Sequence, residues 1–161
     1  MTTQGEGPDR ELRAEVRIDA PPEEVWAALS DFSRMPAWSP ELVRMVRLGR
    51  GAPTPGAQYV GINRRGPVVW PTRNRVVAIE PGRMLAWDTV SSGARWIFEL
   101  EPDGAGTRVM QRRPVAVGLS VLSRVFAPLA LGGSDSHATE LEEGMASTLD
   151  ALKADVESSR R

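Results

Sequence analysis

The sequence contains no cysteine and only one histidine, His137. Without cysteine the chain can form no disulfide framework, no thiolate metal site and no thiol nucleophile. No acidic pair at ligand spacing falls on an expected interior face, so we expect no bound metal. The glycine-containing stretches lack the strand–loop–helix context of a phosphate loop, and we expect no cofactor.

Long apolar runs are also missing. No stretch approaches the roughly 18 apolar residues of a membrane-spanning helix. The first residues, MTTQGEGPDRE, are too polar for a signal peptide. We therefore expect a cytoplasmic protein with no membrane span. The length of 161 residues suits one domain. We expect a disordered tail over 1–11, a single ligand-binding domain over 12–158 and a short tail over 159–161.

The net charge of −1 conceals a segregation along the chain. Residues 1–33 hold eight acids and three arginines, residues 34–124 hold fourteen arginines and six acids, and residues 125–161 are acidic again. A basic middle segment could meet an anionic partner. Its arginines are scattered, however, and no recognition helix or RNA-binding sheet motif accompanies them. We expect no nucleic-acid partner, and the sequence leaves a homodimer open.

Hydrophobic alternation predicts most of the secondary structure. The stretch LRAEVRI alternates apolar and charged residues and predicts a half-buried strand. A short helix follows the proline pair at 21–22, and RMPAWSPEL predicts a second brief helix. Turn residues separate six further strands, which short connections can pair only as an antiparallel meander; they are expected over 43–48, 58–63, 68–79, 83–90, 94–101 and 106–116.

The last part of the chain predicts a long amphipathic helix. In SDSHATELEEGMASTLDALKADVES, apolar residues recur at helical intervals on one face. They are Leu141, Met145, Leu149, Leu152 and Val156. This stripe must cover something apolar, and the sheet is the candidate. The apolar segment 119–131, between the last strand and the long helix, predicts a short helix or a gate.

Four stretches carry a family resemblance: APPEEVWAALSDFSRMPAW, RVVAIEPGRMLAW, GTRVMQRR and GMASTLDALKADVE. In this order and spacing, the chain resembles the polyketide cyclase/dehydrase branch of the START-like (SRPBCC) superfamily over about residues 12 to 158. The resemblance implies an α+β helix-grip fold. In it, a curved seven-stranded antiparallel sheet wraps a long C-terminal helix, with two short helices after the first strand. A deep apolar cavity between sheet and helix is implied as well.

Five tryptophans against three phenylalanines and one tyrosine are an unusual proportion. Strand parity places Trp96 with Phe98 on one face, and Trp87 with Leu85, so both tryptophans are expected to point inward. They either line a pocket or fill the core. A pocket is favoured because Phe, Leu or Ile fills space without an indole N–H to satisfy. The resemblance places Trp38 at the cavity entrance.

Parity also predicts inward polar residues. Gln111 and Arg113 fall on the side of Val109. Val77 and Ile79 suggest that Arg73 and Arg75 point inward and Asn74 outward. A buried guanidinium needs an acidic partner or a ligand that accepts hydrogen bonds. Since no Asp or Glu shares those faces, a ligand is mildly favoured. An exposed position at a sheet edge or at the pocket mouth is the alternative for Arg75 and Arg113.

We therefore expect a pocket built from aromatic, polar and apolar side chains. The candidate ligand-binding residues are Trp38, Trp70, Arg75, Trp87, Trp96, Phe98, Gln111, Arg113, Phe126, His137, Leu141 and Met145. Pro71 leaves the facing of Trp70 open. His137 is a candidate proton shuttle or a capping residue. Gly144 marks either a close helix–sheet contact or room for a ligand.

Three functions compete. Binding of a small hydrophobic molecule, such as a lipid or polyketide, follows from the sheet–helix architecture and the inward tryptophans. The alternative is a cofactor-independent aromatase/cyclase using general acid–base groups, with Arg75, Arg113 and His137 as catalytic candidates. Here the sequence departs from the ring-closing members, because Val77 and Ile79 stand where they carry Ser and Arg. A protein-interaction module is the third, and it needs a large exposed patch.

Overall fold

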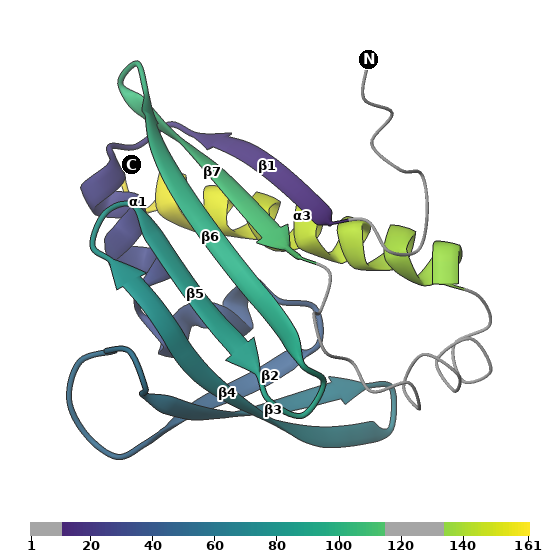
Figure 1. Ribbon diagram of the computed structural model, residues 1–161. Helices are drawn as coiled ribbons and strands as arrows, with labels where there is room; N and C mark the ends of the chain where they lie inside the picture. Colours follow the sequence, from purple (N-terminus) through teal and green to yellow (C-terminus); the bar gives the residue numbers. More distant parts are fainter. Residues whose placement is uncertain (1–10, 115–133) are drawn as a thin grey trace.

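A computed structural model describes residues 11–114 and 134–161. The protein is organised by one curved antiparallel sheet (Figure 1). Its seven strands follow the order β1-β7-β6-β5-β4-β3-β2, so the meander is closed at one edge by the first strand, as the sequence predicts. The strands are β1 (Leu12–Ile18), β2 (Leu42–Leu48), β3 (Gln58–Arg65), β4 (Val68–Glu80), β5 (Met84–Thr89), β6 (Ala94–Asp103) and β7 (Gly106–Arg113).

The helices lie on the concave side of this sheet. The two short ones, α1 (Pro22–Leu29) and the 3-10 helix η1 (Phe32–Ala37), connect β1 to β2. The long helix α3 (Ser134–Ser158) runs alongside β1 and ends beside α1 (Figure 1). The element order and layers confirm the predicted helix-grip fold.

The C-terminal half of α3 is packed into the main core. Leu149 and Leu152 are fully buried, and Val156 is nearly so. They belong to one apolar cluster with Ile18 of β1 and Val25 of α1. Each fully buried leucine contributes roughly 2 kcal/mol by removing apolar surface from water. This half of the helix is therefore anchored by apolar packing.

A polar clasp fixes the same half of the helix. The indole Nε1 of Trp38 donates to Asp155 Oδ2 at 2.9 Å, and Arg34 Nη2 donates to the same oxygen at 2.8 Å. The hydrogen bond from Trp38, with further help from Arg34, lowers the pKa of Asp155 against the opposing effect of burial. Trp38, only 5% exposed, is thus a buried link between η1 and α3.

Strand β4 departs from the predicted parity. Its register with β5 shifts between Val76 and Ala78, which is the signature of a β-bulge. Upstream of the bulge every side chain therefore points to the face opposite to the one that Val77 and Ile79 suggest. Asn74 is buried, whereas Arg73 and Arg75 are exposed on the convex face. The prediction of inward Arg73 and Arg75 and outward Asn74 is wrong for this reason.

This register gives a paired test. Asn74 Oδ1 accepts a hydrogen bond from buried Thr89 Oγ1 at 2.8 Å. Asn74→Ala strands that hydroxyl and should lower the free energy of unfolding by about 1–3 kcal/mol. Arg75→Ala removes an exposed side chain and should change it by no more than about 0.5 kcal/mol. Urea denaturation measures both variants, and the reverse ranking would contradict the bulged register.

The clasp gives a second prediction, with a defined pH dependence. Trp38→Phe keeps the apolar ring but removes the donor to Asp155, so at neutral pH the protein should lose about 1 kcal/mol of stability. A carboxylate whose folded pKa lies below its ordinary value of 3.8 stabilises the fold above that value. This contribution disappears as the pH falls through the folded pKa.

The difference between wild type and Trp38→Phe should therefore shrink once the pH drops below 3.8. Urea denaturation across this range measures it. Trp26→Phe is the matched control, because the half-buried Trp26 indole donates to no described residue. A pH-independent loss in Trp38→Phe would show that only packing is affected.

Candidate functional site

The centre of the concave face is filled by aromatic rings. Phe32 of η1 packs on Tyr59 with ring centroids 4.5 Å apart and meets Trp87 edge-on at 5.9 Å. Trp87 in turn stacks on Phe98 at 5.4 Å. About 180 Å³ of empty space remains beside these rings, and none of it is wide enough for a water molecule. Trp87 and Phe98 face inward as predicted, but here they fill the core.

A row of polar side chains crosses the same face from β3 to β5. Asn63 Nδ2 donates to Thr72 Oγ1 at 3.1 Å, and Asn74 joins Thr72 to Thr89. Gly61 gives the row its space, because a Cβ there would lie 2.7 Å from Thr72 Oγ1. Trp70 pairs with Asn63 and so shares this face, half-buried at the far end of the row.

Strand β7 contributes two inward polar side chains, Gln111 and Arg113. Gln111 is only 5% exposed, and its Oε1 accepts no hydrogen bond from any described residue. Two residues along the strand, the Arg113 guanidinium lies 5.1 Å from the centre of the Trp96 ring. Burial lowers the pKa of Arg113. Both residues share the inner face with Val109, as parity predicts.

Among the described residues, no carboxylate pairs with Arg113. The other inner residues of β1 and β6 at this end of the sheet are apolar or aromatic. A partly desolvated guanidinium next to a buried amide oxygen is costly, since each unused group forfeits the water it would otherwise bind. Among the described residues, Gln111 and Arg113 thus offer one free hydrogen-bond acceptor and one guanidinium without a carboxylate on the same face.

The first half of α3 supplies an apolar wall beside these groups. Met145 is buried with Ala138 and Leu12, and Trp96 and Leu141 pack against this second, smaller cluster. A Cβ built on Gly144 would meet no atom of the described residues within 4 Å, so a close contact between the helix and the described strands does not require this glycine.

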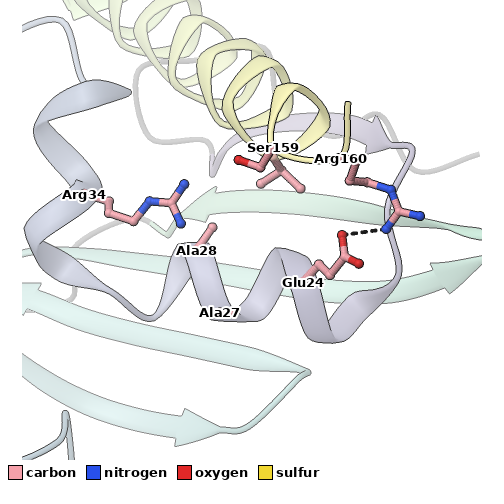
Figure 2. A pocket seen from close by; sticks show the side chains of 7 residues that line it. Glu24, Ala27, Ala28, Arg34, Ser159 and Arg160 are labelled. Atoms are coloured by element: carbon pink, nitrogen blue, oxygen red, sulfur yellow. Dashed lines mark ion pairs between the residues drawn. The ribbon is translucent and has the colours of Figure 1, made fainter.

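A separate pocket of about 470 Å³ opens on the outside, where α1 meets the end of α3 (Figure 2). Its charged side chains already have partners. Arg160 is ion-paired with Glu24, and Arg34 with Asp155. The remaining lining is small: Ala27, Ala28, Val156 and Ser159. This larger pocket offers a ligand no unused polar group, in contrast to the inner face of β7.

The predicted site residues therefore divide into separate groups. Trp96, Gln111, Arg113, Leu141 and Met145 come together at one end of the sheet. Trp38 lies in the clasp on α3, Trp87 and Phe98 lie in the aromatic core, and Arg75 faces outward. His137 belongs to the first turn of α3. Phe126 and the predicted gate over 119–131 lie outside the described residues.

Sequence reasoning missed the buried Asn74 and its partners Thr72 and Thr89. A usable signal was present, because Asn74 is flanked by two arginines. Burying one asparagine costs far less than burying two guanidinium groups without acids. That comparison favours Asn74 as the inward residue, whatever the parity of the strand's other end.

Over 11–114 and 134–161, no three His, Asp or Glu side chains gather closely enough to hold a metal ion. No helix in that part of the chain has the length and apolar character needed to cross a bilayer.

A family model described as polyketide cyclase / dehydrase and lipid transport matches residues 9–157. No curated protein sequence matches the chain.

Several solved structures share the fold. The polyketide cyclase-like protein Cgl2372 from Corynebacterium glutamicum is 24% identical, with a TM-score of 0.66 over 94% of this chain and 93% of its own. Protein NE0264 from Nitrosomonas europaea is 13% identical, with a TM-score of 0.69 over 94% and 97%. The di-domain ARO/CYC StfQ of the steffimycin biosynthetic pathway is 17% identical, with a TM-score of 0.70 over 94% of this chain and 52% of its own. At these identities the likeness concerns the fold.

Proposed function

The chain belongs to the polyketide cyclase/dehydrase and lipid transport family, and from that membership we propose that it binds a small hydrophobic molecule carrying a carbonyl or carboxylate group. The molecule lies between the sheet and the first half of α3, where the start of β6 and the end of β7 are neighbours. Its apolar body contacts Trp96, Leu141 and Met145, and its oxygen accepts from Arg113.

One observation carries this proposal: on the inner face of β7, no described residue donates a hydrogen bond to Gln111 Oε1, and no described carboxylate pairs with Arg113, which contacts only the Trp96 ring. Along a strand, side chains two residues apart lie about 7 Å from each other, so one polar head can reach both. A ligand hydroxyl or enol donates to Gln111 Oε1, and a ligand oxygen accepts from Arg113. The desolvated setting strengthens both bonds relative to water.

The catalytic alternative has less support from the described residues. A cyclase needs acid–base groups that converge on one ligand. Of the candidates, Arg113 faces inward and Arg75 lies on the convex face, so these two do not converge. Binding requires only the polar pair and the apolar wall, and it is the function we favour.

The first test distinguishes the contribution of the ligand's carboxylate from that of its hydrocarbon chain. The probes are cis-parinaric acid, a fluorescent fatty acid, and its methyl ester. Arg113→Gln should weaken binding of the acid by about tenfold, because a charge-assisted hydrogen bond is lost. The ester should be affected far less. Fluorescence titration measures both affinities.

Arg75→Gln is the matched control, since it removes the same charge from the convex face. It should leave both affinities unchanged. If neither probe binds the wild type, or if the two variants lose affinity equally, the proposed site is refuted.

A second test uses the cost of the unpartnered amide. Gln111→Leu replaces it with an apolar side chain of similar size, so the empty protein should gain about 1 kcal/mol of stability. At the same time, parinaric acid should raise the melting temperature of the variant less than that of the wild type. Thermal unfolding with and without the probe measures both effects. A variant that is less stable when empty would mean that Gln111 is satisfied within the protein.

A further inference from the structure

The convex face of the sheet is divided by charge into two halves. On the strands β1, β5, β6 and β7, arginines alternate with acids and are ion-paired; these are Arg13, Arg17, Arg95, Arg108 and Arg112. From Leu42 to Ile79, which covers β2, β3 and nearly all of β4, the sequence holds seven arginines and no acid. Strand pairing places four of the seven, Arg44, Arg64, Arg73 and Arg75, on the convex face. The second half of this face therefore carries a positive charge that its own strands do not neutralise.

Strand pairing shows how these arginines are arranged. Val46 lies opposite Val60, which lies opposite Arg73. Two residues further along β3, Ile62 lies between Arg44 on β2 and Pro71 on β4. Another two residues along, Arg64 lies opposite Val69. We call this surface the arginine–aliphatic face; its members are Arg44, Val46, Val60, Ile62, Arg64, Val69, Pro71 and Arg73.

Two aliphatic members of this face are open to solvent, whereas Val60 and Ile62 are half-buried. Val69 is 59% exposed and Val46 is 38% exposed. Among the described residues, all six large hydrophobic side chains that are exposed lie in β2, at the start of β4 or in the β5–β6 turn. The turn residue, Val90, donates its backbone N–H to Arg73 O at 2.7 Å, so it borders the face. Figure 1 shows these strands at the end of the sheet remote from α3.

From this arrangement we propose that the arginine–aliphatic face docks on the anionic headgroups of a lipid membrane. Arginines near such a surface are attracted to it, and exposed aliphatic side chains are buried at the headgroup boundary. Each arginine contributes roughly a fivefold gain in partitioning, so three contribute roughly a hundredfold. The inference goes beyond the proposed function and does not depend on what the concave site binds.

Other occupants fit this face less well. A second copy would place Arg44, Arg64 and Arg73 against the same charges, and like charges oppose association. Proteins that bind single-stranded nucleic acid combine a basic groove with aromatic side chains on which the bases stack, and protein interfaces use aromatic anchors. The face has no aromatic member, since Trp70 belongs to the concave side.

The experiment is co-sedimentation of the full chain with vesicles of phosphatidylcholine, with and without phosphatidylserine. Wild type should bind only the vesicles that contain phosphatidylserine. Arg44→Gln/Arg64→Gln/Arg73→Gln should bind them roughly a hundredfold more weakly. The charge-matched control is Arg13→Gln/Arg17→Gln/Arg108→Gln, which alters ion-paired arginines on the other half of the same convex face and should retain most of the binding.

A second variant tests the aliphatic part. Val46→Ser/Val69→Ser keeps every charge, so it should still associate at low salt. It should be released at a lower salt concentration than wild type, because screening leaves only the apolar contribution. Circular dichroism and thermal unfolding confirm that each variant is folded.

If both triple variants lose the same affinity for phosphatidylserine vesicles, binding depends only on net charge and the proposal is wrong. The proposal is also wrong if the wild type does not bind these vesicles at low salt. Binding of single-stranded RNA or of polyglutamate in place of vesicles would assign the face to a different polyanion, and also refute it. None of these outcomes affects the parinaric acid test.

Discussion

The packing of α3 against the main core is the constraint on which the rest of the structure depends. Its C-terminal half is held by Leu149 and Leu152 in the main core and by the clasp from Trp38 to Asp155. Because a helix is stiff, anchoring one half determines where the other half lies. Met145 is thereby placed against Leu12 and near Trp96. The clasp and the candidate site are coupled through one rigid element.

The concave face has a packed aromatic centre and a more polar region at the end of β7. Phe32, Tyr59, Trp87 and Phe98 close its centre, so stability there comes from aromatic contacts. Towards the end of β7 the packing gives way to the buried Gln111 and to Arg113. No described residue donates to Gln111 Oε1 and no described carboxylate pairs with Arg113, which is unfavourable for stability. The proposed ligand would offset this cost, as proteins commonly sacrifice some stability at functional sites.

The order of elements was predictable because it rests on local patterns. Alternation in LRAEVRI, glycine or proline in each turn and the apolar stripe of the last helix all survive in the structure. Parity also placed Trp96, Gln111 and Arg113 correctly, since β6 and β7 pair without interruption. It failed on β4, where one extra residue near Val77 reverses the facing of everything before it. Nothing in the local pattern of RVVAIE marks that bulge.

By itself, the sequence determined which segments form strands and helices, and it excluded thiol chemistry, because backbone geometry and composition act locally. Only the tertiary structure decided which inward aromatic rings pack against one another and which border unused polar groups. Trp38 illustrates the difference: its partner Asp155 lies 117 residues away, and only folding brings the two together. The ion pairs of Arg95, Arg108 and Arg112 on the convex face have the same origin, since an ion pair depends on which strands become neighbours.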